Sequence, residues 1–410
     1  MVTKYDIFEF AYTTRNPIKP IEVAKNFNKS KSEYDNIYRM LTQLVHDDLL
    51  KKTDDGFQVR KTDNADVLYQ IIFHCLKSGI NYNQLLNPQL VKFLSSALQK
   101  KEITSQNAKL NPLTLRKYTD ILYKNGLLLL ISEKPLRAKI FSNILLRNIL
   151  VYFGKSVHIP EDTTNYFEEI EKELVRFRKL KRENETTYMQ IIDDFEISFI
   201  HHSLSLEGNP ITLNETKRIL VDKIIPANLK IKDIDEVKNY QQSLVQMLKD
   251  SHEKKPLTLQ TILNYHHRAM QHLDIAGRIR TVEVHISGNP SFRITKATHI
   301  EKELAELLEK YNDFIRKRKT LKEILSFAVY FHNEFQHIHP FEDGNSRTTR
   351  LITFHLLQSK DIPIFDIPYG LLDEYLGYTK GARTREDQKL LSNLQKVILY
   401  NLKKINERLK

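Results

Sequence analysis

The sequence predicts a mainly α-helical protein with a few short β-hairpins. Over most of the 410 residues, apolar side chains recur with the spacing of one helix face, and from about residue 188 onward this period dominates. The chain has only 11 glycines and 13 prolines, so long loops should be few. Hydrophobic residues make up 41% of the chain and charged residues 28%, which is enough apolar material for the cores of two to four domains.

The first sixty residues are predicted to fold as two helices and a hairpin. A short helix fits residues 21–27, and the capping-box pattern Ser30–Glu33 opens a second helix. One face of that helix is apolar and consists of Tyr34, Ile37, Leu41 and Leu44. The dipeptide Asp55-Gly56 then marks a hairpin turn between two short strands. Because this order is typical of a winged helix-turn-helix, we expect a winged-helix-like domain over residues 1–62.

A second unit of similar plan, winged-helix-like or simply helical, is expected over residues 63–150. Asn111 is an N-cap residue, and Pro112 favours the first position of a helix. The helix that they open has apolar residues at Leu115, Tyr118, Ile121 and Leu122. Asn125-Gly126 ends this helix, and the apolar run 127–131 is strand-like.

The remainder is predicted to be a helical linker over residues 151–250 and a helical domain over residues 251–400. The linker begins with a charged helix within residues 155–190, which we expect to be solvated. The helical pattern is interrupted at residues 280–294 by three apolar residues that alternate with polar ones: Val282, Val284 and Ile286. With a turn at Gly288–Pro290, this segment predicts a β-hairpin inside the helical domain.

The net charge of +12 favours an anionic partner, which could be nucleic acid, a phosphate compound or an acidic membrane surface. The first domain has four basic residues in or beside its predicted hairpin: Lys51, Lys52, Arg60 and Lys61. These residues fit contact with DNA, and they equally fit a solvated face.

Cysteine usage and hydropathy predict a cytoplasmic protein. Cys75 is the only cysteine, which excludes an intramolecular disulfide and a cysteine-based zinc site. The first fourteen residues include acidic side chains and no long apolar stretch, so they do not have the pattern of a signal peptide. The longest apolar run, residues 127–131, is far too short to cross a membrane, so no membrane contact is expected.

The most informative segment is His337–Arg350, which lies between two predicted helices. Apolar residues repeat along one helix face before it, and the same pattern resumes after it at Leu351. Gly344 opens onto the second helix, whose first backbone N–H groups have no partner within the helix and attract anions. The segment therefore predicts an anion site at the start of a helix.

Four side chains of this segment suit phosphoryl or nucleotidyl transfer. Asp343 is an oxygen ligand suited to Mg²⁺, whose usual partner is a polyphosphate. His339 could serve as a general base. Arg347 and Arg350 are three residues apart in the first helical turn, so we expect them to lie side by side and to point at the same anion.

Other chemistries fit this segment less well. The spacing of His332, His337 and His339 matches no common zinc motif, and we expect His337 to be structural. A metal-dependent nuclease or phosphohydrolase would need a second acidic cluster, and the sequence has none near residues 332–350.

The segment resembles the Fic family signature, H-x-F-x-(D/E)-G-N-G-R-x-x-R. Seven positions match: His339, Phe341, Asp343, Gly344, Asn345, Arg347 and Arg350. Ser346 stands where the family usually has a second glycine; a serine still offers its backbone N–H to a phosphate but adds a Cβ beside it. The resemblance covers about residues 190–400 and implies an all-α bundle with a β-hairpin flap.

The resemblance also implies a role for each residue in a protein adenylyltransferase. His339 would deprotonate a Tyr, Ser or Thr hydroxyl of a protein target, which then attacks the α-phosphorus of ATP. Asp343 would hold Mg²⁺ between the α- and β-phosphates, and Phe341 would anchor the loop. The anion hole and the β- and γ-phosphate contacts would come from Gly344, Asn345, Ser346, Arg347 and Arg350. The flap residues 282, 284 and 286 would align an extended target segment by strand addition.

A second motif lies upstream, at the end of a helix predicted over about residues 188–208. Ser203 and Glu207, with Gly208 after them, resemble the Fic inhibitory motif (S/T)-x-x-x-E-(G/N). The resemblance implies that Glu207 reaches Arg350 and blocks productive binding of the γ-phosphate. Because both motifs lie in one chain, the inhibition would act in cis.

Three functions remain open from the sequence. The first is a protein adenylyltransferase that acts on another protein or on itself and is held back by Glu207. The second is a de-AMPylase that uses the same site to remove AMP. The third is a winged-helix DNA-binding regulator whose Fic domain senses nucleotide.

Overall fold

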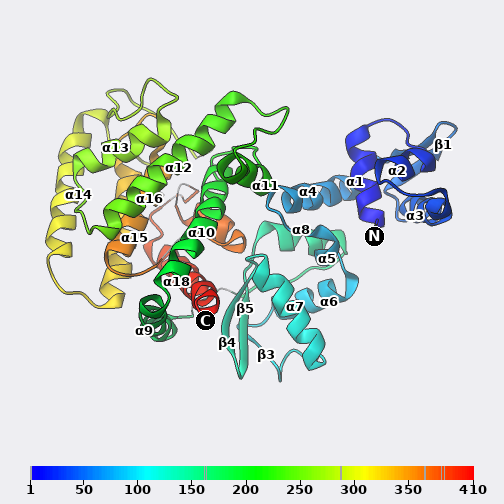
Figure 1. Cartoon of the computed structure of the whole chain (residues 1–410), viewed down its shortest axis with the longest axis horizontal. Helices are drawn as coiled ribbons and strands as arrows, with labels where there is room; N and C mark the ends of the chain where they lie inside the picture. The colour runs from blue at the N-terminus through cyan, green and yellow to red at the C-terminus, as the bar shows by residue number, and fades with distance from the viewer. Residues whose placement is uncertain are drawn as a thin grey trace. The chain divides into compact units, whose positions relative to one another are not determined.

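The computed structural model describes residues 2–160, 162, 164–286, 289–363, 366–379, 381–382 and 384–410. These residues form two compact units, which Figure 1 shows as ribbons coloured along the chain. The first unit contains residues 1–100 and 144–159, and the second contains residues 101–143 and 160–410. These units do not coincide with the four segments expected from the sequence, because residues 101–143 pack with the C-terminal part of the chain.

The first unit is helical apart from one hairpin. Its elements are α1 (Lys4–Thr14), α2 (Pro20–Asn26), η1 (Lys31–Glu33), α3 (Tyr34–His46), β1 (Leu50–Thr53), β2 (Gly56–Val59), α4 (Asp63–Lys77), α5 (Tyr82–Leu85), α6 (Pro88–Ala97) and α8 (Ile144–Tyr152). Ile18, between α1 and α2, pairs with Phe57 of β2 through both backbone hydrogen bonds. Gly56 has φ 140°, and a Cβ there would lie 2.6 Å from the Ile18 carbonyl oxygen, so this close pairing requires glycine.

The start of α3 differs from the sequence expectation. The capping box over Ser30–Glu33 is not formed, because the Ser30 and Ser32 hydroxyl groups bond to each other at 2.7 Å. Residues 31–33 make a 3₁₀ turn instead, and α3 begins at Tyr34 without a side-chain cap. The competing local bond between two serines therefore delays the helix by one turn.

The second unit begins with a three-stranded antiparallel sheet and one helix. β3 (Ile103–Thr104), β5 (Leu136–Ile140) and β4 (Leu128–Glu133) are neighbours in that order. The helix α7 (Pro112–Lys124) starts as predicted, with the Asn111 side chain accepting a bond from the Leu113 N–H at 2.9 Å. The strand expected at residues 127–131 is observed as the first part of β4.

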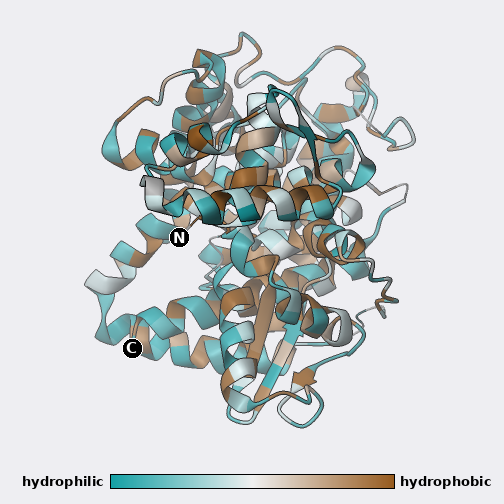
Figure 2. Cartoon of the chain, turned by 90° about the vertical axis from the view of Figure 1, so that its right-hand side faces the viewer, coloured by the Kyte–Doolittle hydropathy of each residue, from teal (hydrophilic) through white to brown (hydrophobic). Residues whose placement is uncertain are grey.

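The rest of the second unit is a helical bundle. Its elements are α9 (Phe167–Glu183), α10 (Glu185–Ser205), α11 (Leu213–Lys217), η2 (Arg218–Asp222), α12 (Ile231–His252), α13 (Leu259–Met270), η3 (Ala297–His299), α14 (Ile300–Ile315), α15 (Leu321–Ile338), α16 (Asn345–Ser359), η4 (Tyr369–Leu371), α17 (Leu372–Tyr378) and α18 (Asp387–Arg408). Figure 2 shows that several helices of the chain carry hydrophobic and hydrophilic residues in alternation along their length. The bundle expected from the 3.6-residue period is confirmed.

The charged helix α9 is not the solvated connector expected from its composition. It buries Ile170, Leu174 and Phe177. Glu173 on the same face is 5% exposed and bonds to Lys403 of α18 at 2.6 Å and to Asn406 at 2.8 Å. The sequence of α9 does not reveal its buried face, because one of the buried positions is a glutamate that is paired in the fold.

The predicted flap at residues 280–294 also differs from expectation. Residues 280–286 and 289–294 form no strand, and Gly288 of the predicted turn lies outside the described residues. The two arms bond to the end of α15 and to the loop after it: the Thr295 N–H donates to His337 O and the Arg280 N–H donates to Pro340 O, both at 2.9 Å. The expected hairpin is therefore replaced by an irregular segment.

Arg280 is the physical reason for this difference. Its side chain is fully buried, and its guanidinium donates to the carbonyl oxygens of His339 (2.7 Å), Val282 (2.8 Å) and Thr295. One planar cation thus occupies acceptors on both arms that a hairpin would pair with each other.

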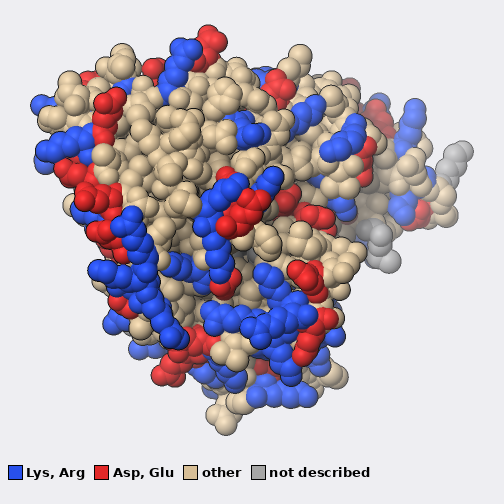
Figure 3. Space-filling view, turned by 60° about the vertical axis from the view of Figure 1, so that its left-hand side comes forward, with Lys and Arg blue, Asp and Glu red and all other residues tan. Residues whose placement is uncertain are grey.

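Three further observations concern the described part of the chain. In the part of the chain that the structure describes, no helix is long and apolar enough to cross a bilayer. Figure 3 shows acidic and basic residues interspersed on one face, with Lys and Arg most dense toward its lower part. Cys75 is completely buried in α4, as expected from its apolar neighbours.

Candidate active site

The segment singled out by its sequence is the loop between α15 and α16. His339 ends α15 in the left-handed region, with φ 49°, and Gly344 precedes α16 with φ 81°. The first intrahelical bond of α16 runs from the Thr348 N–H to Gly344 O at 2.9 Å. The N–H groups of residues 345–347 precede that bond, so they remain available to an anion at the positive end of the helix.

His339 is 8% exposed and its tautomer follows from its surroundings. Its Nδ1 lies 3.2 Å from the Gln336 carbonyl oxygen, which can only accept a hydrogen bond. In the neutral ring the proton therefore sits on Nδ1, and the lone pair sits on Nε2. This is the form in which a histidine can take a proton from a substrate.

Asn345 closes the loop with its side chain. Its Oδ1 accepts from the Phe341 N–H at 3.0 Å, and its Nδ2 donates to Phe341 O at 2.7 Å. The Asn345 side chain is therefore committed to the loop, and only its backbone N–H can contribute to an anion hole. Phe341 is fully buried, in agreement with its expected role as an anchor.

His266 of α13 holds the same loop, and sequence reasoning missed it. Its ring stacks on Phe341 at 3.7 Å and 2°, and its Nε2 lies 2.9 Å from the Asp343 carbonyl oxygen. Its Nδ1 accepts from the Gly277 N–H at 2.9 Å, and burial lowers its pKa to about 4. A histidine on the apolar face of a helix gives no signal in one sequence that separates it from an ordinary core residue.

Gly344 is required by close packing. Its conformation favours glycine, and a Cβ would lie 2.9 Å from the Met270 sulfur and 3.1 Å from His266 Nε2. The loop therefore lies directly on α13.

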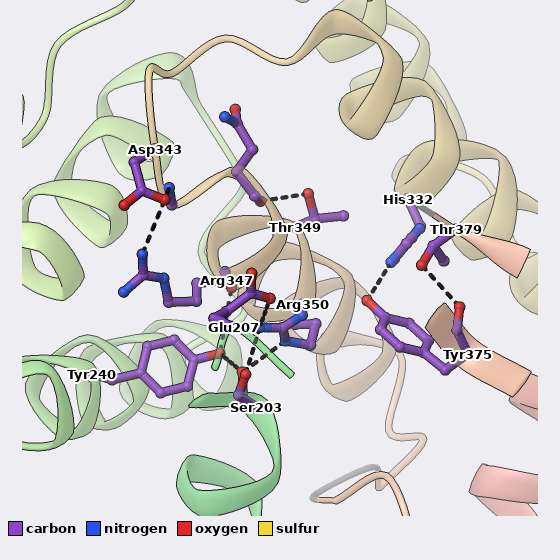
Figure 4. A network of polar contacts seen from close by, with 12 residues as sticks. Ser203, Glu207, Tyr240, His332, Asp343, Arg347, Thr349, Arg350, Tyr375 and Thr379 are labelled. Carbon is purple, nitrogen blue, oxygen red and sulfur yellow. Dashed lines mark hydrogen bonds and ion pairs between the residues drawn. The ribbon is translucent and has the colours of Figure 1, made fainter. Parts of the chain in front are cut away.

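Asp343 and Arg347 form an ion pair beside the loop, at 3.1 Å between the Asp343 Oδ1 and the Arg347 Nη2. The Asp343 side chain is 59% exposed, whereas Arg347 is 5% exposed. Figure 4 shows that Arg347 and Arg350 point to different acidic partners. The expectation that both arginines face one anion is therefore not met in this state, because each guanidinium is engaged by its own carboxylate.

The second motif lies against Arg350, which is 1% exposed (Figure 4). The guanidinium donates from Nε to Ser203 Oγ at 2.7 Å, and from Nη2 to both Ser203 O and Glu207 Oε1 at 2.9 Å. Burial opposes the charge on Arg350, but the Glu207 carboxylate outweighs it, and the pKa of Arg350 is raised. The structure thus brings together Ser203, Glu207 and Arg350.

Tyr240 of α12 joins this network and was not anticipated. It is fully buried; its hydroxyl accepts from Ser203 Oγ at 2.8 Å and donates to Arg347 O at 3.4 Å. The hydroxyl therefore links the end of α10 to the first turn of α16.

His332 and His337, the two other histidines considered as metal ligands, each have partners within the protein. His332 is buried with its Nε2 2.9 Å from the Tyr375 hydroxyl. His337 stacks on Phe292 at 4.6 Å, and its Nδ1 lies 2.8 Å from Arg293 O, so it is structural as expected. Among the described residues, no group of three or more His, Cys, Asp or Glu side chains is arranged to hold a metal ion by itself.

The remaining predicted site residues are near the surface. Val282 is 50% exposed, and Val284 and Ile286 are partly exposed on the irregular segment that replaces the hairpin. Ser346, the second residue of α16, is also partly exposed.

The family model and the curated relatives that this chain matches carry the same family name. Residues 256–357 match the Fic/DOC family. The protein adenylyltransferase Fic of Drosophila willistoni is 28% identical over 189 residues, which are 45% of this chain and 36% of that protein. Its counterpart from Drosophila erecta is 29% identical over 190 residues, with the same two shares. The chain thus spans little more than a third of the length of the curated relatives it matches.

A solved structure shares the fold. The Fic domain containing signaling protein of Bacteroides thetaiotaomicron superposes with a TM-score of 0.53 and 21% identity, covering 58% of this chain and 96% of that chain. At this identity, the likeness concerns the fold alone.

Proposed function

We propose, on the premise that this chain belongs to the Fic/DOC family, that it is a protein adenylyltransferase. It transfers AMP from ATP to a Tyr, Ser or Thr hydroxyl of a protein target, which can be the chain itself. The observation that carries the proposal is the loop between α15 and α16, which combines a histidine with its lone pair on Nε2 and a helix start with three unused N–H groups.

The reaction uses these groups in one displacement. The His339 Nε2 takes the proton of the target hydroxyl, and the hydroxyl oxygen forms a bond to the α-phosphorus of ATP. The bond from that phosphorus to the bridging oxygen breaks, and pyrophosphate leaves with the electron pair. The N–H groups of residues 345–347 stabilise the charge that develops on the phosphate oxygens.

Asp343 is suited to hold Mg²⁺ in this reaction. It offers one largely exposed carboxylate beside the phosphate position, which fits an ion that takes few protein ligands and completes its shell with phosphate oxygens and water. When bound, Mg²⁺ neutralises part of the polyphosphate charge. Arg347 would exchange its pairing with Asp343 for the phosphates.

Glu207 holds this activity back in cis. Arg350, which we assign to the terminal phosphates, is occupied by Glu207 and by both oxygens of Ser203. A γ-phosphate can reach this guanidinium only if the Glu207 carboxylate leaves. Removal of AMP from a modified target is the alternative activity of the same site.

A labelling experiment tests the proposal. ATP carrying a radioactive α-phosphate is incubated with the unaltered protein, with Glu207→Gly and with Glu207→Gly/His339→Ala, in the presence of cell extract. We expect label mainly with Glu207→Gly and none with the double variant. Glu207→Gly/His252→Ala is the matched control, because His252 is exposed at the end of α12 and should leave labelling unchanged.

Two other outcomes have clear meanings. Equal label in the His339→Ala variant would contradict the role of this histidine. If no variant takes up label but the protein releases AMP from a target adenylylated beforehand, the de-AMPylase is the correct assignment.

A second candidate function concerns residues 4–59, which we propose to form a winged helix that contacts DNA. Lys52 of β1 donates to the Tyr38 hydroxyl of α3 at 3.3 Å, so the hairpin and α3 present one continuous surface, and both Lys51 and Lys52 are exposed. Lysines that contact phosphates make duplex binding weaken steeply with salt. We expect Lys51→Glu/Lys52→Glu to reduce both duplex affinity and its salt dependence; a parent protein that binds no duplex at low salt would exclude this function.

A further inference from the structure

We propose that His266 is a positioning residue that sets the peptide between Asp343 and Gly344, and through it the phosphate cradle and the Asp343 carboxylate. The inference rests on the proposed function, because it concerns nucleotide binding at the same site. His266 lies on α13, 77 residues before Asp343, and is fully buried.

The hydrogen bonds of His266 fix its tautomer. A backbone N–H can only donate, so Nδ1, which receives the Gly277 N–H at 2.9 Å, must be unprotonated. The proton of the neutral ring is therefore on Nε2, which donates to the Asp343 carbonyl oxygen at 2.9 Å. The ring thus has one donor and one acceptor, and each has a backbone partner.

The bond to Asp343 O orients the next amide. In a trans peptide the C=O and the N–H point in opposite directions, so fixing the Asp343 carbonyl toward α13 turns the Gly344 N–H away from it. That N–H lies 2.5 Å from the Asp343 Oδ1, and so it also restrains the carboxylate that we assign to Mg²⁺.

Packing leaves this peptide little other freedom. The His266 ring stacks flat on Phe341, two residues before Asp343. At Gly344, which has φ 81°, a Cβ would lie 2.9 Å from the Met270 sulfur and 3.1 Å from His266 Nε2, so α13 also packs closely against this residue. The loop is therefore held at Phe341 by the ring face and at Asp343 by the ring edge.

Loss of the donor should loosen the cradle. The Asp343 carbonyl would lose its hydrogen-bond partner on α13, and the peptide would lose the bond that orients it. Loss of one intramolecular hydrogen bond corresponds to an effect of up to about tenfold, which we expect here in the affinity for nucleotide.

The test uses the full chain with Glu207→Gly as the parent and ADP with Mg²⁺ as the probe, measured by calorimetry. His266→Gln can place an amide N–H near the position of Nε2, His266→Asn can keep only an acceptor near Nδ1, and His266→Phe keeps only the stacking. We expect His266→Gln to bind ADP within about threefold of the parent, and the other two about tenfold more weakly, with a smaller gain from Mg²⁺.

His355→Gln is the matched control. His355 is a fully buried histidine near the C-terminal end of α16, and its ring centroid lies 6.2 Å from that of Tyr265. Its replacement should lower the melting temperature like the His266 variants but leave ADP affinity unchanged.

The outcomes separate the inference from the proposed function. If the parent binds no ADP, the proposed function fails first. If the parent binds ADP and His266→Gln binds as weakly as His266→Phe, or if all variants bind equally, His266 does not act through its donor. A measurement on the unaltered protein does not depend on any variant folding: nitrogen NMR of the His266 ring should show the Nε2–H tautomer, and an Nδ1–H tautomer would overturn the inference.

Discussion

Replacing Glu207 should raise the affinity for ATP in two measurable steps. Arg350 is 1% exposed and Glu207 is 19% exposed, so their 2.9 Å contact is a charge-assisted hydrogen bond with little solvent screening. Such a bond contributes about 1.5–3 kcal/mol, whereas a neutral bond contributes about 0.5–1.5 kcal/mol. ATP must displace this contact to use Arg350.

Two substitutions of Glu207 should therefore raise the affinity for ATP by different factors. Glu207→Gln keeps a neutral acceptor and should tighten ATP binding by roughly five- to tenfold, since 1.4 kcal/mol is a factor of ten. Glu207→Gly removes the acceptor and should tighten binding by roughly ten- to a hundredfold. Both variants should melt at lower temperature than the parent without ATP, because a buried guanidinium has lost its counter-charge, and both should gain more from added ATP.

Calorimetry with ATP in the His339→Ala background measures these affinities without turnover. Asp194→Asn is the matched control, since Asp194 lies on α10, the helix that ends two residues before Glu207, and pairs with Arg408 at the surface. The reasoning is refuted if both Glu207 variants bind ATP within twofold of the parent, or if Asp194→Asn gives the same gain.

Three further predictions concern stability and reactivity. Asn345→Ala should lower the free energy of unfolding by about 2 kcal/mol, because it leaves the buried N–H and C=O of Phe341 without partners. Denaturant unfolding measures this free energy, and a change below about 0.5 kcal/mol would show that the loop closes without Asn345. Burial raises the pKa of the Cys75 thiol to about 12, so the native protein should resist iodoacetamide at pH 8 and react only when the first unit opens, which mass spectrometry detects; rapid labelling of native protein would contradict this burial. Burial lowers the pKa of His355 to about 4, below its unfolded value near 6.5, so its contribution to stability is complete above pH 6.5 and is lost as the pH falls toward 4. In a plot of the free energy of unfolding against pH, His355→Gln should flatten this range relative to the parent. Parallel curves for the two proteins would contradict the assignment.

The parts of the site that are local in sequence could be predicted from it. The loop from His339 to Arg350 is one uninterrupted segment, and its chemistry depends on residue types at fixed spacing. The helices on either side are amphipathic, so periodicity placed them correctly. The contact of Glu207 with Arg350 spans 143 residues, and it was anticipated only through a resemblance to a known motif.

The parts that depend on tertiary packing could not be predicted. His266 and Tyr240 are single buried side chains on helices whose patterns are ordinary, and their partners Asp343 and Arg347 lie 77 and 107 residues away. The alternation at residues 282–286 predicted a strand that the structure does not form, and it could not reveal that Arg280 would take the carbonyl groups of Val282 and Thr295. The buried Glu173 of α9 was hidden because a charged residue is expected outside unless its partner is known.

The three hydrogen bonds of Arg280 affect how precisely a target hydroxyl is positioned. One rigid, planar group fixes the distance between the segment proposed to receive the target and the backbone of His339. The precision with which a target hydroxyl is positioned at His339 then depends on the fixed bond lengths and angles of one side chain, and not on several flexible contacts. A target that displaces Val282 or Thr295 would also shift the backbone of His339, because Arg280 bonds to all three residues. A misplaced substrate would therefore move the histidine out of the position that the reaction requires.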